Sequence, residues 1–232
     1  MSHLHIPDGL LPAWLWITGI VLAVLLVFTA IFMRRGSELK KDVPILGMMS
    51  AMMLVGMNLE IVPIAYHVNL SVITGILLGP WLGIITAFIV NIILSLTGHG
   101  GITVVGLNTL VIGSETVLGW MIFRLVRRFM RPGFAAGIST VVTLFVSTCV
   151  MLGIVALANL DLSAATLHEV HDILSSNLAM KIGPALHIDP GFDFRFFATV
   201  ALGAGAVGWT IESLVTAVAV KFIARVKPEM LR

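Results

Sequence analysis

The stretch LPAWLWITGIVLAVLLVFTAIFM at residues 11–33, followed directly by Arg34 and Arg35, decides the fold class of this chain. It is almost entirely apolar, and a helix of about 20 such residues crosses ~30 Å of hydrocarbon. Basic residues concentrate in cytoplasmic loops of membrane proteins. We therefore expect residues 11–33 to be the first transmembrane helix, with the N-terminus outside and the arginines in the cytoplasm.

The composition extends this prediction to the whole chain. Of its 232 residues, 58% are hydrophobic and 11% are charged, whereas soluble domains carry roughly 25% charged residues. The single cysteine, Cys149, excludes an intrachain disulfide framework and a Cys-rich zinc site. We expect an all-α integral membrane protein in the cell membrane, with residues 1–232 forming one membrane domain.

The spacing of basic residues predicts about seven transmembrane helices. Almost no basic residue occurs between Lys41 and Arg124, so an even number of crossings must join these two cytoplasmic clusters. Four helices fit that length, although Gly79-Pro80 makes the short second one a candidate for a tilted or broken helix. The C-terminus is then cytoplasmic and residues 159–194 form an external loop. After the first helix, the expected helices are 44–63, 70–79, 82–96, 102–123, 134–158 and 196–220.

The N-terminal segment, residues 1–10, begins Met-Ser-His-Leu-His-Ile-Pro-Asp-Gly. A terminal amine, a backbone amide nitrogen and a nearby imidazole can chelate one divalent cation, and such nitrogen sets favour square-planar Ni(II) or Cu(II). His3 and His5 supply imidazoles at the required distance from the amine. This pattern predicts a transition-metal chelator standing at the membrane surface.

The predicted topology adds His67 to the same side, at the external end of the second helix. This arrangement is typical of a metal site assembled from the N-terminus and one helix end. Glu60 could orient such a site or be a plain interfacial carboxylate. Other polar residues interrupt apolar helices and are expected to hydrogen-bond inside the bundle: Asn91, Asn108, Glu115 and Glu212.

Five motifs carry a resemblance to a known family. In chain order they are His5-Ile-Pro-Asp-Gly9, Leu78-Gly-Pro-Trp81, Gly98-His-Gly-Gly-Ile-Thr103, Gly106-Leu-Asn-Thr109 and Ile211-Glu-Ser-Leu-Val-Thr-Ala217. This series resembles the CbiM/NikM proteins, the substrate-specific membrane components of cobalt and nickel energy-coupling-factor (ECF) transporters. The resemblance covers nearly the whole chain.

The resemblance implies a seven-helix fold whose external N-terminus inserts inward. It also implies metal ligation by the terminal amine, a backbone amide, the adjacent histidine and a later histidine, whose position His67 matches. The implied partners are a transmembrane T component, two cytoplasmic ATPase subunits and often a small auxiliary membrane subunit. The chain has no GxxxxGK[ST] loop, so ATP hydrolysis would belong to those partners and this chain is not an enzyme.

The N-terminus departs from the family pattern, in which a histidine usually stands second. His5 aligns with that histidine, yet it lies farther from the amine. If Met1 is retained, its amine, the amides of Ser2 and His3, and the His3 imidazole form a four-nitrogen plane. If Met1 is removed, Ser2 supplies the amine. Chelate geometry favours His3, and the expected metal set is Met1, Ser2, His3, His5 and His67.

The function expected from the sequence is capture of Ni(II) or Co(II), as transported substrate, for an ATP-driven importer, with no organic cofactor and no nucleic-acid partner. The choice between nickel and cobalt stays open. A stand-alone secondary carrier or channel is the alternative, but only scattered polar residues are available for its pathway. An intramembrane hydrolase would need a base beside Ser139 or Ser213, and the histidines cluster elsewhere. A structural subunit would leave the His-rich N-terminus unexplained.

Overall fold

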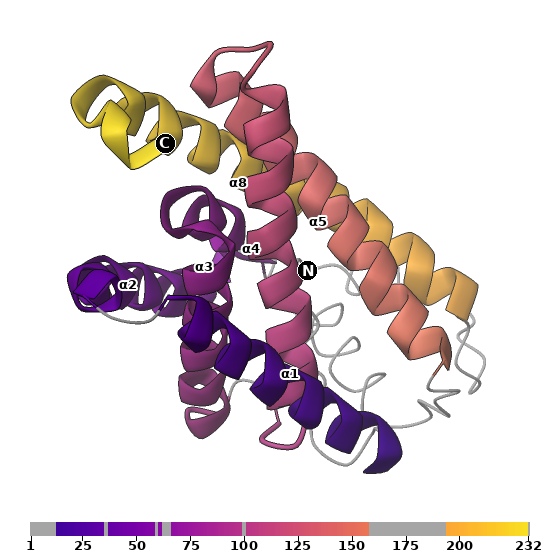
Figure 1. The fold of residues 1–232 in the computed structure, drawn as a ribbon. Coiled ribbons are helices and arrows are strands. Elements are labelled where there is room, and N and C mark those ends of the chain that lie inside the picture. The colour runs from indigo at the N-terminus through magenta and orange to yellow at the C-terminus, as the bar shows by residue number, and fades with distance from the viewer. Residues whose placement is uncertain are drawn as a thin grey trace.

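The structure, a computed structural model, describes residues 13–34, 37–58, 60–61, 66–98, 101–157 and 194–231. These residues form a bundle of long helices (Figure 1), which confirms the all-α membrane fold class. The candidate metal-binding residues 1–10 and most of the predicted external loop, residues 159–194, lie outside the described residues. The helices are α1 (Ala13–Met33), α2 (Ser37–Asn58), α3 (Ser71–Leu96), α4 (Val105–Val126), α5 (Pro132–Leu157), α8 (Phe194–Val226) and the short 3-10 helix η1 (Pro228–Leu231).

Within the described residues, five helices are long and apolar enough to cross a membrane: α1, α3, α4, α5 and α8. The apolar part of α2 is shorter, Asp42–Asn58. Many large apolar side chains point outward, such as Phe28 and Phe32 on α1, which are 68% and 53% exposed. An exposed apolar surface of this kind is suited to lipid, so the chain is a multi-pass membrane protein.

The predicted helices 70–79 and 82–96 are the two parts of α3, which bends at Gly79. Gly79 has φ 77° and ψ 177°, a conformation open to glycine, and Pro80 disfavours a helical residue before it. The first part, residues 71–78, is only ~12 Å long at 1.5 Å per residue. It cannot cross ~30 Å of hydrocarbon. The expected break is confirmed, but the prediction of 70–79 and 82–96 as two separate crossings is wrong, because both belong to the single candidate span Ser71–Leu96.

The other helices keep their predicted order with shifted ends. The largest difference is at α2, which spans Ser37–Asn58 where 44–63 was predicted. It begins earlier because the polar residues before Pro44 also favour a helix, so the apolar run alone marked its start wrongly. It ends earlier because the chain turns into a strand pair, β1 (Glu60–Ile61) and β2 (Tyr66–His67), whose antiparallel register sets Glu60 opposite His67.

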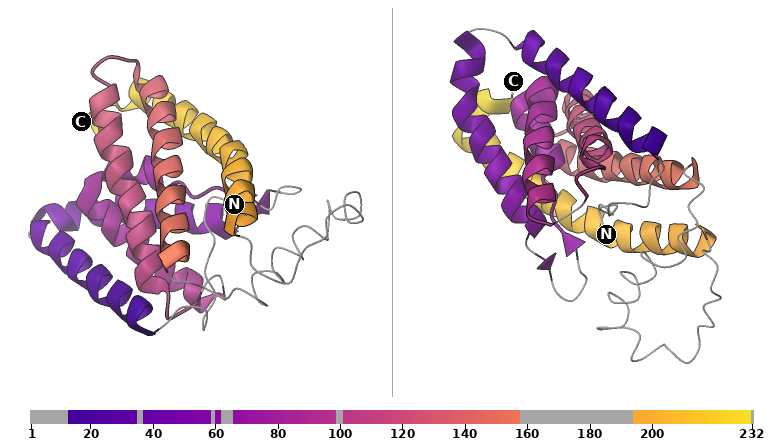
Figure 2. Two further views of the ribbon diagram at one scale, coloured as in Figure 1. Left: turned by 90° about the vertical axis from the view of Figure 1, so that its right-hand side faces the viewer. Right: turned by 90° about the horizontal axis from the view of Figure 1, so that it is seen from below.

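α4 packs against α1, α3 and α5, and α3 contacts every other long helix of the described bundle. A Cβ atom added at Gly106 of α4 would lie 2.5 Å from the carbonyl carbon of Gly19 in α1, so the two backbones touch there. α5 and α8 lie side by side, with α1 on the opposite side of α4 (Figures 1 and 2). The interior that these helices enclose contains buried polar residues, among them Glu115 and Glu212.

Candidate metal-binding segment and buried polar cluster

His67 is the one predicted metal ligand within the described residues. It ends β2, and its side chain is half-buried. Met1, Ser2, His3 and His5 lie outside the described residues, so their ligand role stays a prediction. Across the strand pair, the backbone register sets Glu60 opposite His67.

Directly after His67 the chain enters the bundle interior. Asn69 and Ser71 are both completely buried. Between them, Leu70 takes a left-handed conformation with φ 58° and ψ 14° and occupies the N-cap position of α3. A leucine side chain cannot accept hydrogen bonds from the first N–H groups of a helix. No side chain caps α3 at this position, and the backbone before the helix is held instead by groups from elsewhere in the fold.

Glu212 of α8 binds the two backbone N–H groups that come immediately before α3. One carboxylate oxygen accepts a hydrogen bond from the Leu70 backbone N–H at 3.1 Å, and the other accepts from the Asn69 N–H at 3.4 Å. A carboxylate at a helix N-terminus also compensates the positive end of the helix dipole. Glu212 thus anchors the two residues that lead into α3, from 142 residues away in the chain.

Glu115 of α4 holds the same segment from another side. One of its oxygens accepts hydrogen bonds from the Asn69 side-chain amide and from the Ser71 hydroxyl, both at 2.6 Å. Its other oxygen accepts from the Ser147 hydroxyl of α5. The residues Asn69, Ser71, Glu115, Ser147 and Glu212, here called the buried polar cluster, therefore join four helices around the chain that follows His67.

The sequence predicted part of this cluster. Glu115 and Glu212 hydrogen-bond inside the bundle, as expected. Asn91 instead donates to the Ala87 carbonyl of its own helix, so its expected interhelical bond is not the one formed. Asn69 and Ser71 were not singled out. Their proximity to His67 in a polar stretch before an apolar helix was the available signal.

α2 contacts the segment through a glycine. A Cβ atom added at Gly56 would lie 2.5 Å from the Val68 carbonyl oxygen. Only a residue without a side chain lets α2 approach the backbone that closely. The residue next to His67 is therefore packed directly against α2.

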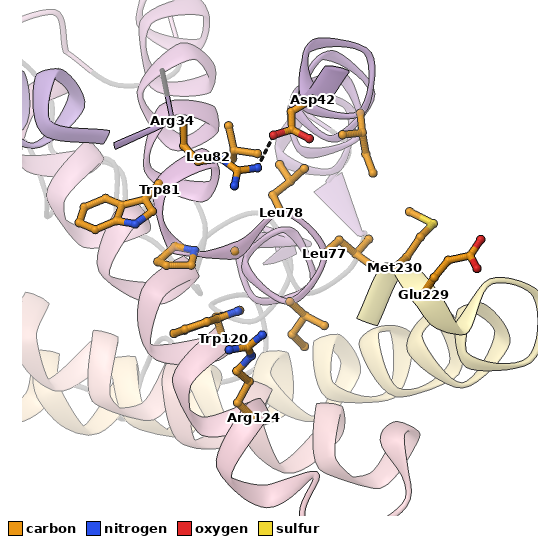
Figure 3. A pocket seen from close by; sticks show the side chains of 14 residues that line it. Arg34, Asp42, Leu77, Leu78, Trp81, Leu82, Trp120, Arg124, Glu229 and Met230 are labelled. Atoms are coloured by element: carbon orange, nitrogen blue, oxygen red, sulfur yellow. Dashed lines mark hydrogen bonds and ion pairs between the residues drawn. The ribbon is translucent and has the colours of Figure 1, made fainter. Parts of the chain in front are cut away.

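A separate cavity of about 370 Å³ lies at the bend of α3. Figure 3 shows Trp120 and Arg124 on one side of it and the ion pair of Arg34 with Asp42 on the other. The Arg124 guanidinium carbon lies 4.6 Å from the centre of the Trp120 ring, a cation–π contact. No predicted metal ligand lines this cavity, so it is distinct from the His67 region.

Comparisons with known proteins agree with this architecture. No curated protein sequence matches the chain. The crystal structure of a transition metal transporter has a similar fold, with TM-score 0.67 and 19% identity over 96% of this chain and 93% of that chain. A truncated transition metal transporter gives TM-score 0.66 and 19% identity over 99% and 100%. The family model of the cobalt uptake substrate-specific transmembrane region matches residues 5–230, so the chain belongs to the CbiM family.

Proposed function

We propose that this protein captures Ni(II) or Co(II) at the membrane for an ATP-driven importer. The observation that carries the proposal is the position of His67 directly before a segment fixed by two buried carboxylates. An imidazole is a good ligand for Ni(II) and Co(II), and a rigid neighbouring backbone limits its motion. Membership of a cobalt uptake family supports the same class of substrate.

The remaining ligands would come from the N-terminus. Among the described residues, no group of three or more His, Cys, Asp or Glu side chains is arranged to hold a metal ion. A complete site around His67 would therefore need other donors. The proposed donors are the terminal amine at Met1, the amide nitrogen of Ser2, and the imidazoles of His3 or His5. An all-nitrogen plane would favour Ni(II), and an added axial ligand would admit Co(II).

Partner subunits would supply the energy. The chain has no phosphate-binding loop, so we assign ATP hydrolysis to two cytoplasmic ATPases linked through a transmembrane T component, often with a small auxiliary subunit. These partners would dock on the face that carries Arg34 and Arg124. The α3 cavity is lined by both of these arginines, which supports contact there.

The secondary-carrier alternative gains one supporting observation. Buried carboxylates at membrane depth commonly mark ion pathways, and Glu115 and Glu212 are both completely buried in helices that could span a membrane. Their hydrogen bonds to the chain after His67 support an anchoring role instead. Transport measurements without ATPase partners, described in the Discussion, separate the two functions.

The direct test of the proposed function is an N-terminal extension. If the terminal amine is a ligand, a short tag before Met1 displaces it, and we expect high-affinity Ni(II) binding to be lost. A tag of the same length after Arg232 is the matched control and should leave binding unchanged. Isothermal titration of both purified proteins measures the difference. An N-terminally tagged protein that binds one Ni(II) as tightly as the control would refute this ligand set.

A further inference from the structure

We propose that Glu212 and Glu115 are positioning residues for His67, and that they set the metal affinity without contacting the metal. This inference rests on the proposed function, because it assumes that His67 is a ligand. It goes beyond that function by naming the groups on α8 and α4 that determine where the ligand stands.

The chain between His67 and its anchors is very short. Only Val68 separates His67 from Asn69, and an extended chain reaches at most ~3.6 Å per residue. The backbone of His67 therefore lies within about 7 Å of the first anchored residue. Asn69 is held twice, by its backbone N–H on Glu212 and by its side-chain amide on Glu115. A shift of either carboxylate must move His67.

The backbone conformation of this segment also needs external support. Leu70 is the only non-glycine residue with positive φ among the described residues. L-amino acids rarely adopt this conformation unless surrounding contacts hold it. The Leu70 N–H donates to Glu212 at 3.1 Å, and Ser71, the next residue, donates to Glu115 at 2.6 Å. The two carboxylates therefore bracket the strained residue and fix the direction in which the chain leaves His67.

The charges fit this anchoring role. The N-terminal end of a helix is the positive end of its dipole, and residues 71–78 are the first part of α3, before the bend at Gly79. Glu212 accepts from the Asn69 and Leu70 N–H groups just before this helix start. Glu115 accepts from the side chains of Asn69, Ser71 and Ser147. Buried carboxylates are costly unless their oxygens accept hydrogen bonds. Most of the groups that donate hydrogen bonds to Glu115 and Glu212 belong to residues 69–71, directly after His67.

The first experiment compares Glu212→Gln with Glu229→Gln. A glutamine has one acceptor oxygen, so at position 212 it can serve only one of the two N–H groups and turns an NH₂ toward the other. Glu229 is exposed in η1, and the same change there is the control. We expect Glu212→Gln to raise the Ni(II) dissociation constant by about 10- to 100-fold, the usual range for groups that orient a metal ligand. Glu229→Gln should not change it.

A second pair tests Glu115 with a smaller change. Ser71→Ala and Ser147→Ala each remove one hydroxyl that donates to the same carboxylate. Ser71 belongs to the anchored segment, whereas Ser147 lies on α5. We expect Ser71→Ala to weaken Ni(II) binding more strongly and to alter the absorption bands of bound Ni(II). Equal effects of the two variants would show that Glu115 acts only as general packing support.

Hydrogen exchange of the metal-free protein gives a readout that does not depend on metal. In Glu212→Gln, the amides of Asn69 and Leu70 should exchange faster, while those of α4 should not change. If the unaltered protein binds neither Ni(II) nor Co(II), the proposed function fails. If it binds metal, and Glu212→Gln keeps both its affinity and its slow exchange, the positioning role is overturned and the proposed function stands.

Discussion

At the scale of single residues, the backbone at and just after His67 is held at two places that matter for the proposed metal binding. The His67 backbone pairs with the strand that carries Glu60, and the residues after it are anchored on Glu115 and Glu212. An anchored donor loses little conformational freedom when the metal binds, so less binding free energy is spent on ordering it. Removing such a donor should therefore be costly.

We expect His67→Ala and His3→Ala each to lower Ni(II) affinity by about 100-fold or more, equivalent to roughly 2.8 kcal/mol. Each variant removes one nitrogen donor. His168→Ala and His171→Ala, in the predicted external loop, are the controls and should have little effect. Isothermal titration measures all four. A larger loss from the loop variants than from His67→Ala would mean that the site has been assigned to the wrong residues.

His5→Ala decides between the two N-terminal chelates within the same series. If terminal chelate geometry governs the site, His3→Ala weakens binding more than His5→Ala. The opposite order would show that the alignment with the family motif governs it. Intact-mass measurement of the same samples tells whether Met1 is present, because its loss makes Ser2 the terminal amine.

At the scale of elements, α2 and α3 meet through the residue next to His67. Gly56 of α2 touches the Val68 carbonyl, whereas Gly47 on the same helix has open space around its Cα. The two glycines differ in what an added methyl group would meet. Substituting each of these two glycines by alanine therefore tests whether the contact with Val68 positions the segment, with Gly47 as the control.

We expect Gly56→Ala to weaken Ni(II) binding by about tenfold or more, because the new Cβ would lie 2.5 Å from the Val68 oxygen and must push the segment away. Gly47→Ala should leave binding unchanged and slightly favour the helix, by up to ~1 kcal/mol. Titration and thermal unfolding of both variants provide the measurements. Unchanged metal affinity in Gly56→Ala would mean that the segment adjusts without consequence for the site.

At the scale of the whole molecule, the proposed metal capture would need a source of energy from other subunits. The described helices suit a bilayer, and the chain contains no phosphate-binding loop. Release of a metal from several nitrogen ligands requires conformational work. α8 carries Glu212 and continues to Val226, so a partner that moves α8 could loosen the anchored segment.

Vesicles that contain this chain alone should therefore bind Ni(II) in a saturable manner but should not accumulate it against a gradient. Adding the T component, the ATPases and ATP should produce concentrative uptake. Radioactive nickel uptake, with and without an imposed proton gradient, makes the comparison. Accumulation by the chain alone under a proton gradient would favour the secondary-carrier function.

The sequence by itself determined the fold class, the order of the helices and the break at Gly79-Pro80. These features follow from local properties: apolar length, charge beside each run, and the restricted backbone of proline. Its motifs also identified the family. The metal ligands at the N-terminus and the orientation in the membrane remain predictions.

Only the tertiary structure decided what the buried polar residues do. Glu212 and Leu70 lie 142 residues apart, and no pattern of hydrophobicity specifies that they meet. The same holds for the α2 contact at Val68, because a close approach depends on how whole helices pack. Buried backbone N–H groups need acceptors, and which distant side chain accepts from Asn69 and Leu70 is settled only when the helices are assembled around them.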